Sequence, residues 1–214
     1  MKLLGINIDN ELKFDKHVNE ICLKANQKLS ILNRMKSFLN LKKRRSIFKA
    51  FIESQFKYCP LIWFFHSRKS SQKVNRLHER ALRIVYDDFD STFEQLLEQD
   101  NSFSIHTQSI HRLCIEIFKN LNKLPSGDYI SDFINLKHED TLELDIPSVN
   151  SELKGKCSLR YFGPVIWNSL PVDLRKSESL AMFQAKIKSL KFDNCPCRNC
   201  KTFVSGVGFC CVSG

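Results

Sequence analysis

Along most of this chain, apolar side chains recur at the three- and four-residue spacing of an amphipathic helix. We expect Asp15 to cap the first helix, Asn40 to cap a second that continues to Pro60, and Ser70 or Ser71 to start a third. A capping box, Ser91 to Glu94, opens a short fourth helix. The residues expected on the buried faces are Val18, Ile21, Cys22, Ala25, Leu29, Leu32, Met35 and Leu39; Ile47, Phe48, Phe51 and Phe56; Val74, Leu77, Ala81, Ile84 and Val85; Ile110, Leu113, Cys114, Ile117, Phe118 and Leu121; and Leu180, Phe183, Ile187 and Leu190.

Two segments favour strands instead of helices. The run "LLGINI" is β-prone around Gly5 and predicts one short strand, and residues 141–166 contain two β-prone runs around a polar turn, which predicts a hairpin. Glycine is scarce, with 7 residues in 214, and the helical runs are long. We therefore expect a mainly α fold, a helical bundle with a short N-terminal strand and a small β-hairpin near 141–166.

The net charge of +10 is distributed unevenly along the chain. Residues 1–90 contain 19 Lys and Arg against 9 Asp and Glu, whereas residues 91–214 contain 14 of each. Such asymmetry suggests a half that binds a polyanion, although an ordinary solvated basic surface would give the same count. We expect a basic helical region at 1–90, a neutral helical region with the hairpin at 91–192, and a cysteine-rich tail at 193–214.

Within the basic region, one helix face carries a row of cations. Lys73, Arg76, Arg80 and Arg83 fall within roughly 80° of one another at about 100° per residue, beside the apolar stripe. Such a ridge can lie along a phosphate backbone. The alternative is a solvated cationic face, which the sequence alone does not exclude.

The stretch "RIVYDDFD" contains Tyr86, Asp87 and Asp88, a tyrosine followed by two aspartates as in polymerase active sites. A polymerase pair lies in the tight turn of a β-hairpin, where it aims carboxylates at two divalent metals. Here the residues upstream form an arginine-rich helical pattern, and a cap and another helix follow. We therefore predict that Tyr86-Asp87-Asp88 is a helix end followed by a solvated turn.

Five of the nine cysteines lie in the last 20 residues. Cys195, Cys197 and Cys200 have a spacing that can hold one zinc ion, with Cys210 or Cys211 as the fourth ligand. Reduced thiols without metal are the alternative. No apolar run reaches the length of about 18 residues that spans a membrane, and the N-terminal apolar run is too short for a signal peptide. We therefore expect an intracellular protein, in nucleus or cytoplasm, with free or metal-bound thiols.

Longer stretches carry a family resemblance. "KLLGINIDNELKFDKHVNEICLKANQKLSILNRM" resembles the segment that follows the catalytic palm in reverse transcriptases of non-LTR, LINE-type retrotransposons, most of all the jockey-like elements. Further matches, in the same order as in the family, are "SQFKYCPLIWFFHSR", "VNRLHERALRIVYDD", "GKCSLRYFGPVIWNSLP" and "NCPCRNCKTF". The matches extend over nearly the whole chain.

The resemblance implies that the chain corresponds to the primer grip, thumb and C-terminal part of such an RNA-directed DNA polymerase. Leu4 and Gly5 would belong to the grip against the primer end, although a plain turn also explains Gly5. The helices after it would form a thumb along the template–primer. The residues that would then contact phosphates are Lys42, Lys43, Arg44 and Arg45, with Lys73, Arg76, Arg80 and Arg83.

The family's fingers, palm and metal-binding aspartates have no counterpart in these residues. The intact enzyme would need Mg²⁺, but its ligands are not in this chain, so we expect no polymerase activity from it alone. The expected capacity is sequence-independent binding of RNA, DNA or their hybrid, in a partial copy whose native packing partner would be the palm and fingers. Two alternatives stay open: a domesticated helical protein-interaction module, and the tail of an intact enzyme whose gene model starts too late.

Overall fold

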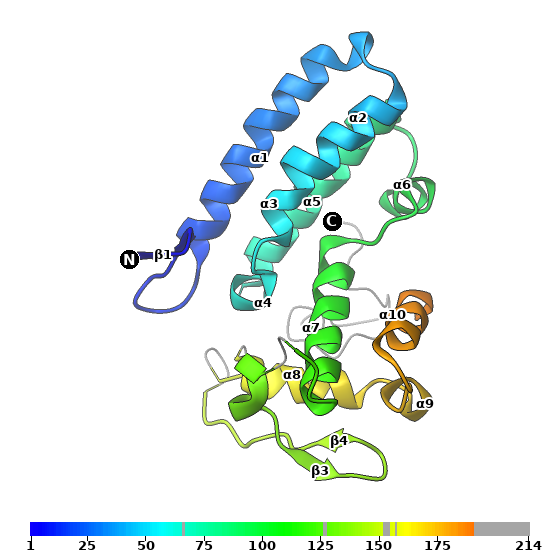
Figure 1. Cartoon of the computed structure of the whole chain (residues 1–214). Helices are drawn as coiled ribbons and strands as arrows, with labels where there is room; N and C mark the ends of the chain where they lie inside the picture. Colours follow the sequence, from blue (N-terminus) through cyan, green and yellow to red (C-terminus); the bar gives the residue numbers. More distant parts are fainter. Residues whose placement is uncertain (66, 126–127, 152–154, 157, 191–214) are drawn as a thin grey trace. The chain divides into compact units, whose positions relative to one another are not determined.

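The computed structural model describes residues 1–65, 67–125, 128–151, 155–156 and 158–190. It confirms a mainly helical fold with two small antiparallel strand pairs (Figure 1). The chain divides into two compact units at His106, whereas the charge balance of the sequence changes near residue 90. No helix in the described ranges is long and apolar enough to cross a lipid bilayer.

The first unit begins with a tight hairpin instead of the single strand predicted for "LLGINI". Strand β1 (Lys2–Leu3) pairs with β2 (Ile6–Asn7), with Leu3 opposite Ile6. Leu4 and Gly5 form the turn, and both have positive φ angles, of 45° and 86°. Positive φ at both central residues is the requirement of a type I′ two-residue hairpin turn, and Gly5 meets it without steric cost.

Helix α1 (Asp15–Met35) follows a loop that Asp9 organises. The Asp9 carboxylate accepts hydrogen bonds from the backbone N–H groups of Lys13 and Phe14 at 2.9 and 2.7 Å. The prediction that Asp15 caps the helix was therefore wrong, because Asp15 is already the first helical residue. The predicted apolar stripe is buried from Val18 to Leu32, but Met35 is exposed because the helix ends there.

After a short 3₁₀ turn, η1 (Lys36–Phe38), the chain returns along α1 through α2 (Leu41–Ile47), η2 (Phe48–Glu53) and α3 (Ser54–Lys57). Asn40 caps α2 as predicted, accepting from the Lys43 N–H at 3.0 Å. The middle segment η2 is π-helical, and its wider turn changes which side chains face inward. Phe51 is therefore exposed, contrary to the prediction, and Ile52 is buried in its place.

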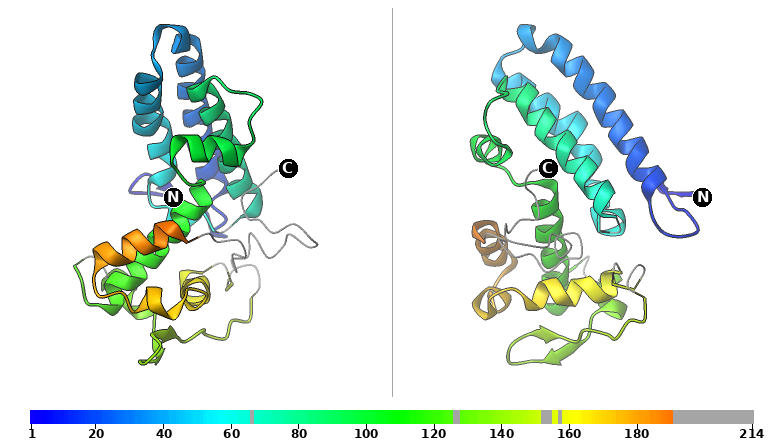
Figure 2. Two further views of the ribbon diagram at one scale, coloured as in Figure 1. Left: turned by 90° about the vertical axis from the view of Figure 1, so that its right-hand side faces the viewer. Right: turned by 180° about the vertical axis from the view of Figure 1, so that it is seen from behind.

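Two further helices complete the first bundle: α4 (Pro60–Trp63) and α5 (Arg68–Tyr86). Ser67 caps α5, accepting from the Ser70 N–H at 3.4 Å, so this helix begins earlier than the predicted Ser70 or Ser71. Helix α5 packs against α1, and η2 packs against both (Figures 1 and 2). The aromatic run after Cys59 supplies Trp63, Phe64 and Phe65 to the core.

Helix α6 (Phe93–Asp100) begins with a capping box, one residue later than predicted. Thr92 and Gln95 form it, because the Ser91 hydroxyl and N–H instead donate to the Asp88 carboxylate at 2.6 and 3.0 Å. Helix α7 (Ile105–Leu121) starts at the boundary between the units, and its predicted apolar stripe is buried from Ile110 to Phe118.

The second unit contains the predicted hairpin, but at different residues. Strands β3 (Leu136–His138) and β4 (Glu143–Leu144) pair near the start of the predicted 141–166 segment, which also contains a helix, α8 (Leu159–Asn168). The β-branched and aromatic residues there bury one helical face instead. Trp167 fixes this arrangement, since its indole N–H donates to the Leu142 carbonyl at 2.7 Å.

Helices α9 (Val172–Arg175) and α10 (Leu180–Ser189) contribute to the core of the second unit. Phe183 and Ile187 are fully buried as predicted. Phe183 stacks on Phe118 with ring centroids 4.5 Å apart and lies 5.8 Å from Trp167. Aromatic packing therefore joins α7, α8 and α10.

Candidate nucleic-acid interface

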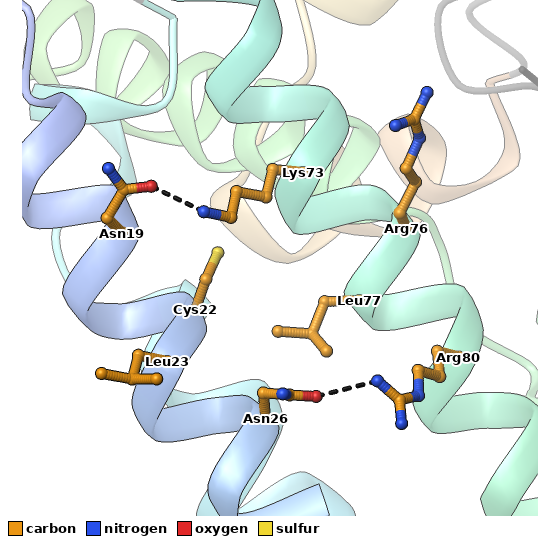
Figure 3. A pocket seen from close by; sticks show the side chains of 8 residues that line it. All are labelled: Asn19, Cys22, Leu23, Asn26, Lys73, Arg76, Leu77 and Arg80. Atoms are coloured by element: carbon orange, nitrogen blue, oxygen red, sulfur yellow. Dashed lines mark hydrogen bonds between the residues drawn. The ribbon is translucent and has the colours of Figure 1, made fainter.

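Helices α1 and α5 enclose a surface groove of about 540 Å³ in the first unit (Figure 3). Cys22 and Leu77 form its apolar part, while Asn19 and Asn26 on α1 face cations on α5. The residues that line the groove are Asn19, Cys22, Leu23, Asn26, Lys73, Arg76, Leu77 and Arg80. Three of the four residues in the predicted basic ridge therefore share one groove.

Polar contacts set the register of the two helices along this groove. The Lys73 ammonium donates to the Asn19 side-chain oxygen at 2.6 Å, and the Arg80 guanidinium donates to the Asn26 side-chain oxygen at 3.0 Å (Figure 3). Each pair is 54 residues apart, so the two helices run in the same direction. Since Asn19 and Asn26 are seven residues apart, they lie on the same side of α1 after two turns.

The acceptors in these contacts are neutral amides, so they do not compensate the positive charges. Within the described part of the chain, neither Lys73 nor Arg80 forms an ion pair with a carboxylate. Both side chains are also exposed to solvent. The groove edge therefore combines fixed cations with an uncompensated charge, which is the electrostatic requirement of a phosphate-binding surface.

Arg83, the fourth residue of the predicted ridge, does not line the groove. Its guanidinium donates to the Glu79 carboxylate at 2.8 Å and to the Phe89 carbonyl at 2.8 Å. The spacing of four residues allows this intrahelical pair. Arg83 is therefore engaged in holding the end of α5, and its charge is balanced locally.

The basic run after Asn40 is divided between two environments. Lys42 and Lys43 are exposed on α2, and Arg44 is half-buried. Arg45 is half-exposed but engaged, because its Nε donates to the Asp100 carboxylate at 2.6 Å. Asp100 is buried, so Arg45 serves the packing of α6 against α2 rather than an open surface.

Tyr86 and Asp100 complete this buried polar cluster. The Tyr86 hydroxyl donates to the Asp100 carboxylate at 2.8 Å, and burial raises the pKa of Tyr86 to about 12. Burial also pushes the pKa of Asp100 upward, but hydrogen bonds from Arg45, Tyr86 and Ser102, together with the charge of Lys49, outweigh it and leave that pKa below its usual value. The cluster is therefore an ionised carboxylate that accepts from Arg45 and Tyr86 and also pairs with the Lys49 ammonium at 3.6 Å.

The Tyr86-Asp87-Asp88 stretch is a helix end, as predicted. Helix α5 ends at Tyr86, and Asp87 follows in the left-handed conformation. Asp87 pairs with Lys36, which lowers the pKa of its carboxyl, and a hydrogen bond from Ser91 lowers the pKa of Asp88. The two carboxylates thus have separate partners, and no group of three or more metal-ligating side chains is found among the described residues.

The predicted grip residues lie in the N-terminal turn. The backbone carbonyl of Leu4 accepts a hydrogen bond from the Tyr58 hydroxyl at 2.6 Å, and the Leu4 side chain is 82% exposed. Gly5 occupies a position where φ alone accounts for glycine, since a Cβ there would meet only an ordinary contact of 3.8 Å with the Tyr58 ring.

Of the cysteines considered in the sequence, Cys22 is among the described residues and the predicted zinc ligands are not. Cys22 lies under the groove, and burial raises its pKa to about 11, which keeps it a neutral thiol. The proposed zinc ligands Cys195, Cys197, Cys200 and Cys210 lie outside the described residues.

Sequence reasoning did not identify the two asparagines of the groove or the exposure of Phe38. The seven-residue spacing of Asn19 and Asn26 beside a buried cysteine was the available signal for the first. Phe38 gave no comparable signal, because an aromatic residue near a helix end is more often buried.

Comparison of the chain with protein-family models, with curated proteins and with solved structures finds no match.

Proposed function

We propose that this chain is the thumb and C-terminal portion of a LINE-type, non-LTR reverse transcriptase, and that its own activity is sequence-independent binding of RNA, DNA or their hybrid. The family assignment rests on the sequence resemblance, which covers nearly the whole chain. The binding activity rests on one observation: Lys73 and Arg80 line a groove with only neutral amide partners.

The spacing of these cations suits a phosphate backbone. Lys73 and Arg80 are seven residues apart on α5, which is about 10 Å along the helix axis, with Arg76 between them. Phosphates on one strand of a duplex advance by about 3.4 Å each, so the row can lie beside about three of them. Such contacts carry no sequence information, because phosphates are the same at every base.

Phosphoryl transfer would need carboxylates that hold two metal ions. By the resemblance, those carboxylates belong to the palm, which precedes the segment that this chain matches. We therefore assign nucleic-acid binding to these residues and expect no primer extension by the purified chain above a no-protein control.

The binding activity can be tested by fluorescence anisotropy with a labelled RNA–DNA hybrid of about 20 base pairs at several salt concentrations. The double variant Lys73→Gln, Arg80→Gln removes two charges from the groove. The matched control, Lys176→Gln, Lys188→Gln, removes two charges from exposed positions of the second unit.

We expect the groove variant to bind at least tenfold more weakly at low salt. The slope of log K against log salt should fall in magnitude by about 2, since each phosphate contact contributes about 0.9. The control should bind within about twofold of the wild type. Equal losses in both variants would show that net charge, rather than the groove, is responsible, and a flat salt response would contradict the proposal.

A further inference from the structure

The turn between α1 and α2 lies at one end of the first unit (Figure 1). It carries an exposed aromatic side chain. Phe38, the last residue of η1, is 86% exposed, the highest value among the large hydrophobic residues that the structure describes. Met35 and Leu41 beside it in the sequence are also exposed, at 45% and 43%. Three exposed apolar side chains within seven residues make this turn a candidate binding surface.

Two cations follow Phe38 closely along the chain. Lys42 and Lys43 lie in the first turn of α2, four and five residues after Phe38, and both are exposed. The Asn40 cap fixes the first turn of α2 and so fixes the backbone from which these lysines project. Within the described residues neither lysine forms an ion pair, so an exposed ring and two uncompensated charges lie within six residues of one another, across the junction of η1 and α2.

A second exposed ring belongs to the same end of the unit. Phe89 is 59% exposed, and the Lys36 ammonium lies 5.5 Å from its ring centroid while also pairing with Asp87. Lys36 thereby ties the loop after α5 to the α1–α2 turn. The neighbouring Asp90 is exposed and negatively charged, which disfavours an anion directly at Phe89. Phe38 is therefore the better platform for an anionic ligand.

We propose that Phe38, Lys42 and Lys43, here called the α1–α2 tip, bind unpaired bases of single-stranded nucleic acid. Phe38 would stack on a base, and the two lysines would contact the adjacent phosphates. An aromatic ring beside cations is the combination used to bind single strands, because every base has a π face and every linkage has a charge. The inference rests on the proposed function and adds to it a preference for single strands.

The duplex form of the same nucleic acid should not use the ring. Its bases are already stacked and paired, so Phe38 could meet only the base at a duplex end, whereas Lys42 and Lys43 would still meet phosphates. We therefore expect Phe38 to contribute to the binding of single strands only, and Lys42 and Lys43 to contribute to the binding of single strands and of duplexes.

The test compares three labelled ligands by anisotropy: a 12-nucleotide thymidine strand, a strand of the same length with abasic sites in place of bases, and a blunt duplex. The full chain is used as wild type, as Phe38→Ala, and as the matched control Phe51→Ala. Phe51 is also an exposed phenylalanine of the first unit, at 57%, but it lies on η2 rather than at the tip. Lys42→Gln, Lys43→Gln serves as the charge variant.

We expect Phe38→Ala to weaken binding of the thymidine strand by about 5- to 150-fold, the range given by base–aromatic stacking. Binding of the abasic strand and of the duplex should change by less than about twofold, and Phe51→Ala should leave all three unchanged. The charge variant should weaken binding of all three ligands. Equal losses on the base-bearing and abasic strands, or no loss in Phe38→Ala, would overturn the tip.

Failure of the tip and failure of the proposed function give different results. If the wild type binds the duplex through the groove but does not distinguish the thymidine strand from the abasic strand, only the tip is overturned. If the wild type binds none of the ligands, both are overturned. If Phe38→Ala behaves as expected while Lys73→Gln, Arg80→Gln binds the duplex normally, the tip stands and the groove assignment fails.

Discussion

Replacing His78 with Phe should make the unfolding free energy of the first unit less dependent on pH. His78 lies on α5 with no exposed surface, and it stacks on Phe48 and meets Phe93 edge-on at centroid distances of 5.7 and 5.6 Å. Neither ring nitrogen has a hydrogen-bond partner within the described structure. Burying a polar ring without hydrogen-bond partners costs free energy of folding. Burying a phenyl ring of similar shape does not carry this cost.

Burial lowers the pKa of His78 from 6.5 to about 4, although the nearby carboxylates of Glu53 and Asp100 oppose the shift. Between these two pH values the unfolded chain binds a proton that the folded chain does not. The neutral histidine therefore contributes its full stability above pH 6.5, and this contribution is lost as the pH falls toward 4. A difference of about 2.5 pKa units corresponds to about 3 kcal/mol of unfolding free energy.

The measurement is urea unfolding of wild type, His78→Phe and His78→Gln between pH 4.5 and 7, with Trp63 as a fluorescence probe in the same unit. Both variants lack the titrating group, so each should show a weaker pH dependence than the wild type, by up to about 1.4 kcal/mol per pH unit. At pH 7, His78→Phe should be at least as stable as the wild type, whereas His78→Gln should be less stable because it buries an unpartnered amide.

An unchanged pH dependence in His78→Phe would refute this reasoning, since it would mean that the folded protein protonates His78 as readily as the unfolded chain does. NMR titration of the His78 ring gives an independent value. His17 and His111 also have lowered pKa values because of burial, so both His78 variants retain some acid sensitivity.

Arg45→Met should destabilise the first unit by about 3 kcal/mol in urea unfolding at pH 7, because it leaves the buried Asp100 carboxylate without its main cationic partner. The exposed neighbour variant Lys42→Met should change stability by less than about 0.5 kcal/mol, and equal effects would show that the pair with Asp100 is not decisive. Gly5→Ala should weaken the N-terminal hairpin by about 1 kcal/mol, because φ is +86° there. Amide hydrogen exchange at Ile8, whose N–H donates to the Met1 carbonyl, measures this as about fivefold faster exchange, and unchanged exchange would contradict it.

The candidate site could be predicted only in part. The sequence indicated that Lys73, Arg76 and Arg80 share a helix face, and they do line one groove. It could not show that Arg45 turns toward Asp100, which is 55 residues away in the chain. The four-residue spacing of Glu79 and Arg83 was visible in the sequence, but whether Arg83 pairs with Glu79 or faces the groove depends on the tertiary structure, because exposed pairs at that spacing are weak.

Sequence alone determined the helical character of this protein, because the 3.6-residue apolar spacing is a local property of each segment. It also determined the helix end at Tyr86, since the polar Asp87 and Asp88 could not continue the buried stripe. Tertiary structure decided where the pattern was ambiguous. The segment around Trp167 is helical because the indole N–H can then reach the Leu142 carbonyl and the indole ring can stack on Phe183. No local spacing encodes these contacts. Short β-prone runs carry little intrinsic preference, so the packing of the whole unit, rather than the run itself, selects helix or strand.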